Sequence, residues 1–303
     1  MQAVTARGRW VWGVSGLATV VALAVPTVQL VTGGGKVWPV SASAHPFPQA
    51  TLTRTMTVPQ RVTSVTVATS GMPVRVMAGE VSRIEITEVF SYDKQAGEPP
   101  AVTPWVSRGS LTLNDSACSD DACGVSFSLM VPPGVAASVT SEGGNVIVNG
   151  TAATVIDSGG GAVRTTRIGG QLNVQTEGGP LQIDGLSGVL NADTGGGPLD
   201  ARNITAATAD VTTEGGDALV AFAVAPGDVH VDTGGGAATL MVPRGPYALT
   251  ADTGGGEEVL DVALDPAAPR SLTIQTEGGP LLIRSRVSAA APAQKVAPPP
   301  PAK

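Results

Sequence analysis

Large side chains are scarce in this chain. Only 10 of its 303 residues are aromatic, and only 14% are charged. A core built with so few rings has to be thin and aliphatic. Apolar residues nevertheless make up 42% of the sequence, which is enough to bury a core and excludes a wholly disordered chain.

Basic residues are also in short supply, with 18 Lys and Arg against 25 Asp and Glu. Residues 1–44 hold Arg7, Arg9 and Lys36 and no acid, so the remainder carries 15 basic against 25 acidic residues. Nucleic-acid binding needs grouped Lys and Arg and is therefore excluded as a role. An acidic exterior fits solvent, cations or cationic partners.

Cysteine and histidine are too few for a metal site built from them. Cys118 and Cys123 lie in CSDDAC, between the alternating stretches SLTLN and VSFSLMV. This pattern predicts a hairpin tip that a disulfide closes in an oxidising compartment; a pair of free thiols is the alternative. His45 and His230 are remote in sequence from both cysteines.

Glycine and proline, by contrast, are abundant, at 39 and 24 residues. From Ser141 onward a four-residue motif recurs: Ser or Thr, then Glu or Gly, then two glycines. It starts eight times, at intervals of 17 to 23 residues, at Ser141, Ser158, Thr176, Thr194, Thr213, Thr233, Thr253 and Thr276. Such spacing predicts a repeat architecture rather than low complexity.

Alternating apolar residues flank each motif, as in LNVQT before the third glycine turn and LQI after it. This is strand periodicity on both sides of a turn, and helical spacing is absent. Two short strands and two turns use up one repeat. The sequence therefore predicts an all-β fold: a parallel β-helix or β-solenoid of about eight coils that bury their apolar faces by stacking.

The same alternation assigns side chains to faces. It places Leu172, Val174 and Thr176 inside and Gln175 and Glu177 outside. The hydroxyls then form an inner column whose expected role is to bond to turn backbone and to one another, because no base recurs beside them to activate a nucleophile. The glycines follow a strand and lead into another strand, which excludes a phosphate loop.

Each repeat carries one outward acid, either Glu just after the hydroxyl or Asp just before it. In six of the seven pairs of consecutive repeats the choice switches, which keeps like charges off directly facing positions about 4.8 Å apart. Asp232 and Asp252 are the exception, and they are the candidate metal ligands, with Ca²⁺ as the candidate ion. No other cofactor is expected, and the calcium-binding nonapeptide is not matched.

Residues 10–32 contain no charge and are long enough to span a bilayer as a helix. Arg7 and Arg9 precede them, which predicts a cytoplasmic N-terminus and an exported remainder. A retained anchor is favoured over a cleaved signal peptide, for which Ala42-Ser43-Ala44 offers a site.

The expected division of the chain follows from these segments. It is a cytoplasmic end (1–9), a transmembrane anchor (10–32), a linker (33–50), an irregular β cap with the cysteine hairpin (51–136), solenoid repeats (137–287) and a disordered Ala/Pro tail (288–303).

At this level the sequence resembles the bacterial β-strand-repeat candidate adhesins, a domain of unknown function in envelope proteins, in an actinobacterial-type arrangement. The opening TVATSGMPVRV, the VPPGV lead-in and the glycine repeats carry the resemblance over residues 51–287. It implies a right-handed β-helix at the cell surface without established catalysis. The chain replaces the family's Ser-Gly-Asp turn with a third Gly or a Glu, so no binding residue is transferred.

Three functions are compatible with these features to different degrees. The favoured one is a membrane-anchored, non-catalytic surface protein, adhesin-like or scaffolding, whose partner is a surface ligand or envelope protein. The alternative is an envelope sensor that binds a cationic ligand and signals through a membrane partner, since nine cytoplasmic residues are too few to signal alone. A polysaccharide-active enzyme is not expected, because the repeats lack carboxylates grouped with basic or aromatic sugar contacts.

Overall fold

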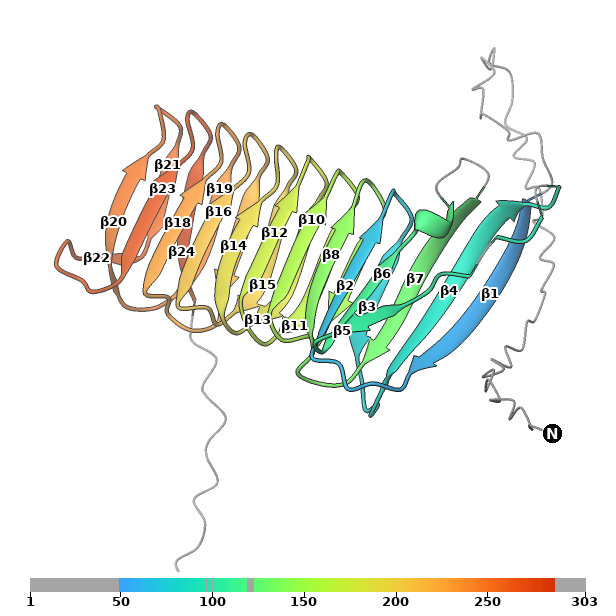
Figure 1. The fold of residues 1–303 in the computed structure, drawn as a ribbon. Helices are drawn as coiled ribbons and strands as arrows, with labels where there is room; N and C mark the ends of the chain where they lie inside the picture. Colours follow the sequence, from blue (N-terminus) through green and yellow to red (C-terminus); the bar gives the residue numbers. More distant parts are fainter. Residues whose placement is uncertain (1–48, 96, 100, 119–122, 287–303) are drawn as a thin grey trace, which may run out of the picture.

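The computed structural model describes residues 49–95, 97–99, 101–118 and 123–286, which form two twelve-stranded sheets (Figure 1). Sheet A contains, in spatial order, β1 (Gln49–Val58), β4 (Ile84–Asp93), β7 (Cys123–Val131), β3 (Val74–Ala78), β9 (Val146–Asn149), β11 (Val163–Ile168), β13 (Leu181–Leu186), β15 (Leu199–Ile204), β17 (Ala218–Phe222), β19 (Ala238–Pro243), β24 (Leu281–Arg286) and β21 (Glu258–Asp261).

Sheet B faces it and contains, from the opposite end, β22 (Ala263–Leu264), β20 (Pro246–Asp252), β23 (Ser271–Gln275), β18 (Asp228–Asp232), β16 (Thr208–Thr212), β14 (Val189–Asp193), β12 (Leu172–Thr176), β10 (Thr154–Ser158), β8 (Ala136–Ser141), β2 (Ser64–Thr69), β6 (Ser110–Asn114) and β5 (Trp105–Ser107). The described residues include no α-helix, so the predicted all-β class with parallel strands is confirmed. The right-handed winding stays a prediction.

One coil consists of a strand in sheet B, a glycine motif and the following strand in sheet A. The inner faces of the two sheets meet in a thin aliphatic core, and the predicted alternation is confirmed. Leu172, Val174 and Thr176 are at most 4% exposed, whereas Gln175 and Glu177 point to solvent. Small and branched side chains suffice because only two strand layers have to be filled.

The last glycine of each motif is required by close packing between coils. A Cβ on Gly179 would lie 2.3 Å from the carbonyl oxygen of Gly161, and a Cβ on Gly197 would lie 2.3 Å from that of Gly179. The same approach, at 2.1–2.3 Å, recurs in all eight motifs. No side chain fits at this position, which explains why the repeat never varies there.

At the C-terminal end, the coils do not follow sequence order. Strand β23 pairs with β18 on one side and with β20 on the other, and β24 likewise lies between β19 and β21. The last coil of the sequence, β23–β24, is therefore inserted beneath the coil that precedes it. The coil formed by β20 and β21 is the outermost (Figure 1).

The N-terminal end is interleaved in the same way. Strand β2 lies between β6 and β8, and β3 lies between β7 and β9, all in parallel register. Residues 51–136, predicted as an irregular cap, thus contain two regular coils, β2–β3 and β6–β7. Beyond them, β4 and β1 extend sheet A as antiparallel strands, and β5 extends sheet B.

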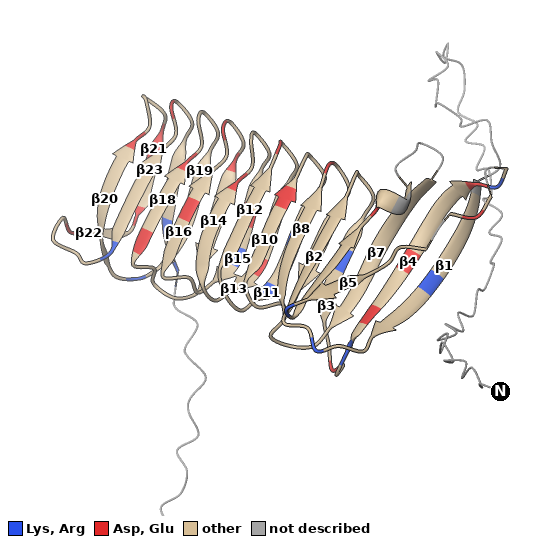
Figure 2. Cartoon of the chain, in the orientation of Figure 1, with Lys and Arg blue, Asp and Glu red and all other residues tan. Residues whose placement is uncertain are grey.

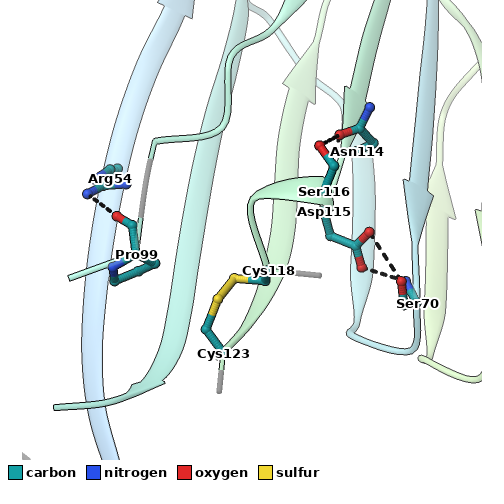
Figure 3. The surroundings of a disulfide bond; sticks show 8 residues. All are labelled: Arg54, Ser70, Pro99, Asn114, Asp115, Ser116, Cys118 and Cys123. Atoms are coloured by element: carbon teal, nitrogen blue, oxygen red, sulfur yellow. Dashed lines mark hydrogen bonds between the residues drawn. A yellow bond between two sulfur atoms is a disulfide. The ribbon is translucent and has the colours of Figure 1, made fainter. Parts of the chain in front are cut away.

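Cys118 and Cys123 form a disulfide with an S–S distance of 2.06 Å (Figure 3). The predicted hairpin is wrong, because β6 and β7 lie in different sheets and pair with β2 and β3 instead of with each other. The disulfide lies where other coils have a glycine motif, next to the 3₁₀ turn η1 (Ser116–Cys118). Asp115 fastens this turn to the neighbouring coil by accepting a hydrogen bond from the Ser70 amide, at 2.5 Å.

Candidate interaction surface

The inner hydroxyl column is structural. All eight motif hydroxyls donate to the carbonyl oxygen of the last glycine of their own motif, as Thr176 does to Gly179 at 3.0 Å and Thr276 to Gly279 at 2.6 Å. The buried hydroxyls thereby satisfy turn carbonyls, as the turn-backbone interpretation predicted. Thr69 adds a ninth member through Met72, so the column reaches into the N-terminal segment.

The outward acids alternate without exception once the coils are taken in spatial order. Because β23 is inserted between β18 and β20, Glu277 stands between Asp232 and Asp252 in the stack. Every neighbouring pair of the eight repeats therefore combines one Glu coil with one Asp coil. The exception predicted from sequence order does not exist in the folded chain.

The structure also separates the candidate metal ligands. Asp232 and Asp252 both lie opposite Gln275, one on each side, which puts them about 9.6 Å apart, or two strand spacings. Calcium ligands lie 2.3–2.6 Å from the ion, so these carboxylates are too far apart to share one. In the described residues no group of three His, Cys, Asp or Glu side chains is placed to hold a metal.

Backbone packing accounts for the Gly at the second motif position of the Asp coils. Where a coil has Glu at the second motif position, its neighbour has Gly there: a Cβ on Gly254 would lie 3.3 Å from the Cα of Glu277. In the Gly coils, the preceding Asp supports the turn, since Asp193, Asp232 and Asp252 each accept a 3.1 Å hydrogen bond from the glycine amide two residues later. These three carboxylates are thus used by their own turns.

The outer face of sheet B lacks basic side chains over most of its length. Its eight strands from β8 to β20 contain no Lys or Arg, whereas sheet A carries Arg164, Arg202 and Arg284. Figure 2 shows acidic segments recurring along sheet B and at its turns. This face therefore carries acidic and neutral side chains, including the exposed Val155 and Val189, and no Lys or Arg.

A shallow groove of about 390 Å³ runs across four strands of this face, β10 to β16. Asn173, Asn191 and Asp210 lie side by side along it, and the Asn191 amide donates to Asn173 at 2.7 Å. Asp157 and Asp193 line one side. Amides and carboxylates presented in rows can bind hydroxyl, amine or guanidinium groups, and they provide no nucleophile and base in contact.

Sequence reasoning missed a buried carboxyl group in the N-terminal cap. Glu88 on β4 is 0% exposed, and among the described residues neither of its side-chain oxygens has a hydrogen-bond partner. Arg54 lies opposite it on β1 but donates to the Pro99 carbonyl at 2.9 Å and stacks over Phe90. Burial raises the pKa of Glu88 to about 7, and the charge of Arg54 opposes this shift.

That position could have been found from the sequence. In RIEITEVF the residues Ile84, Ile86 and Phe90 share one parity with Glu88, which places its side chain on the apolar face.

No protein-family model and no curated protein matches the sequence. Among solved structures, a candidate adhesin from Bacteroides fragilis is similar, with 14% identity, coverage of 77% of this chain and 96% of that chain, and a TM-score of 0.47. A candidate adhesin from Parabacteroides merdae is 12% identical, with coverage of 77% of this chain and 95% of that chain, and a TM-score of 0.47. A candidate cell adhesion protein from Clostridium sporogenes is 12% identical, with coverage of 77% of this chain and 99% of that chain, and a TM-score of 0.25. These likenesses assign no partner or activity to this chain.

The predicted membrane anchor, residues 10–32, lies outside the described residues. Within the part of the chain that the structure describes, no helix is long and apolar enough to cross a membrane.

Proposed function

We propose that the protein is a non-catalytic, adhesin-like interaction protein of the cell surface, which binds its partner through the outer face of sheet B. The observation that carries this proposal is the run of eight neighbouring strands without a Lys or Arg, crossed by the groove at Asn173, Asn191 and Asp210. The stacked coils hold these side chains in register, so a partner meets a preorganised surface and little ordering entropy is lost on binding.

We further propose that residues 10–32 are a retained single-pass anchor and that the remainder lies outside the cell. Arg7 and Arg9 before the apolar run support this orientation. The disulfide between Cys118 and Cys123 is consistent with an oxidising compartment. The sheets would then extend about 50 Å from the N-terminal cap to the outermost coil, at about 4.8 Å per strand.

Location is tested on intact cells that produce the full chain. A membrane-impermeant amine reagent should label Lys94, which lies on the exposed turn after β4. Arg7→Glu with Arg9→Glu removes the orienting charges and should reduce labelling. If Lys94 is labelled only after the cells are lysed, the domain is not extracellular. A mature protein that begins at His45 contradicts the retained anchor.

The binding face is tested by attachment of such cells to surfaces coated with poly-lysine or with dextran. Asp193→Arg with Asp210→Arg places two cations in the groove and should abolish attachment to whichever coating holds the wild type. Asp184→Arg with Asp200→Arg makes the same change of charge on the outer face of sheet A and should leave attachment unchanged. Equal loss in both variants would show that net charge, rather than the sheet B face, governs attachment.

A further inference from the structure

The outermost C-terminal coil exposes apolar side chains that no other coil covers. Val259 and Leu260 on β21 and Leu264 on β22 are 45%, 37% and 50% exposed. They are three of only seven large apolar residues exposed in the described chain. Next to them, Leu249 and Val262 are only partly buried against the core.

The same coil presents unpaired strand edges. Strand β21 pairs only with β24, and its other side has no neighbour among the described strands. Strand β20 pairs with β23 along 248–252, while β22 covers only Pro246 and Tyr247 on its other side. Free backbone donors and acceptors beside exposed apolar side chains are the requirements for adding a further strand.

At the opposite end of the stack, the edge strand of sheet A lacks half of this combination, and the edge strand of sheet B, β5, exposes one large apolar side chain, Trp105. Strand β1 also has no neighbour on one side among the strands that the structure describes, but it buries Leu52 and Val58 at 1% and 4% exposure. Its fully exposed positions are mainly threonines, at 51, 53, 55 and 57. The β1 edge therefore offers backbone hydrogen bonds without an apolar contact.

The charge pattern on β21 defines what would pair with it. Its four residues are Glu258, Val259, Leu260 and Asp261, so an acid stands at each end of an apolar pair. Directly opposite residues in a strand pair interact most strongly. A complementary strand has a basic residue, two apolar residues and a second basic residue, and this pattern reads the same in a parallel or an antiparallel alignment.

A second copy of this chain does not supply such a strand. Antiparallel pairing of two β21 strands sets Glu258 against Asp261 twice, which is unfavourable. Arg164 and Arg167 are the only basic residues in the whole sequence that are spaced three apart, and they enclose two threonines on β11. Strand β11 is already paired on both sides, with β9 and β13.

We propose that the free edge of β21 binds an extended segment of a different protein, in which two apolar residues lie between two Lys or Arg residues. The backbone of the segment would continue sheet A. Its apolar pair would cover Val259 and Leu260, and its cations would contact Glu258 and Asp261. This site lies at the end of the stack and does not depend on the binding face proposed above.

The probe is a fluorescein-labelled peptide, Thr-Thr-Lys-Val-Val-Lys-Thr-Thr, titrated into the full chain in detergent and followed by anisotropy. Replacing both lysines by Glu, or the second Val by Pro, should weaken binding at least tenfold. Hydrogen exchange should show protection of the β21 amides. Binding that survives the proline, or protection at β1 instead, overturns the proposal.

Charge reversal at the edge provides the second measurement. Glu258→Lys with Asp261→Lys should lose the Lys peptide and bind the Glu peptide. It should also pair with the wild-type chain, because the two edges are then complementary, and form a 1:1 dimer in sedimentation while each chain alone stays monomeric. Glu177→Lys with Asp210→Lys changes two exposed mid-stack acids and should leave peptide binding unchanged. Failure to form the mixed dimer, or equal loss in the mid-stack variant, refutes edge pairing.

Discussion

The two ends of the stack share one feature, an interleaved coil order, and differ in how the outermost coil is covered. At both ends the outermost coil is not the terminal one in sequence, since β2–β3 and β23–β24 each lie one coil inward. The N-terminal end is then closed by antiparallel strands, a disulfide and buried aromatic side chains, Phe90 and Phe127. The C-terminal end has only β20 to β22, and every residue of β21 is exposed.

This difference shows that interleaving and capping are separate devices. A terminal coil that is inserted between two other coils has a partner strand on both sides in both sheets, so it cannot fray alone. Covering the outermost coil is a separate feature. Further strands cover it at the N-terminal end, and none of the described strands covers it at the C-terminal end. Repeat arrays are stabilised mainly by nearest-neighbour interfaces, so a coil with two neighbours should tolerate less change than a coil with one.

The largest effect is therefore expected in the tucked C-terminal coil. The Cβ of Gly279→Ala would lie 2.1 Å from the Gly236 carbonyl oxygen, with coils on both sides preventing a shift. We expect a loss of at least about 3 kcal/mol in the free energy of unfolding. Gly256→Ala makes the same contact with Gly279, at 2.2 Å, but its coil can move outward, so about 1 kcal/mol is expected. Urea denaturation measures both.

Gly143→Ala is the matched control, because nothing lies within 4 Å of a Cβ at Gly143 in the same kind of motif. Its effect should stay within about 0.5 kcal/mol. Equal losses for Gly279→Ala and Gly256→Ala would contradict the inference that the outer coil is free to yield.

Strand periodicity, facing and the glycine turns could be predicted from sequence because each coil repeats the same local pattern. Leu172 and Thr176 were placed correctly by parity alone. Coil order could not be predicted, because it depends on which neighbours fit. The sequence order puts two Gly coils, at Thr233 and Thr253, together, and only the insertion of Thr276 with Glu277 between them restores the alternation.

The disulfide gives a smaller effect, confined to the N-terminal end. Cys118→Ser with Cys123→Ser removes a short covalent loop, which by loop-closure entropy costs about 2 kcal/mol. Hydrogen exchange should show faster opening of β6 and β7 with unchanged protection of β23 and β24. Loss of protection at both ends would show that the stack unfolds as one unit and that the two ends are not independent.

Because of Glu88, we expect the free energy of unfolding of the N-terminal end to depend on pH. Its folded pKa, about 7, lies above its ordinary value of 4.5, so between these values the folded state keeps a proton that the unfolded state has lost. Stability contributed by the protonated group is present below pH 4.5 and declines as the pH rises to about 7. The upper limit is about 1.4 kcal/mol per pKa unit, and movement of Arg54 toward the carboxylate reduces it, so we expect about 1–2 kcal/mol.

Chemical denaturation at pH 5 and pH 8 measures this difference. Glu88→Gln keeps the shape and removes the titration, so the two curves should converge. Glu85→Gln alters an exposed acid on the same strand and should preserve the dependence. An unchanged pH dependence in Glu88→Gln would assign it to other groups.

The candidate surfaces were less accessible to sequence reasoning than the fold. The acidic rows are visible as a pattern in the sequence. Sequence order predicts Asp232 and Asp252 as neighbours, however, and the insertion of β23 separates them. The β21 edge gave no signal at all, since EVLD resembles other short strands until its missing neighbour is known.

The smallest effect is expected at the open end itself. Leu260→Ala shortens a side chain that is 37% exposed on a strand with one neighbour, so its cost should be below about 1 kcal/mol. Ile283→Ala, on the adjacent strand β24 and directly opposite, removes a fully buried side chain and should cost about 2–5 kcal/mol. Binding of the Lys peptide should show the reverse order, with Leu260→Ala the more damaging. A large stability loss for Leu260→Ala would mean that β21 serves to close the core rather than to receive a partner.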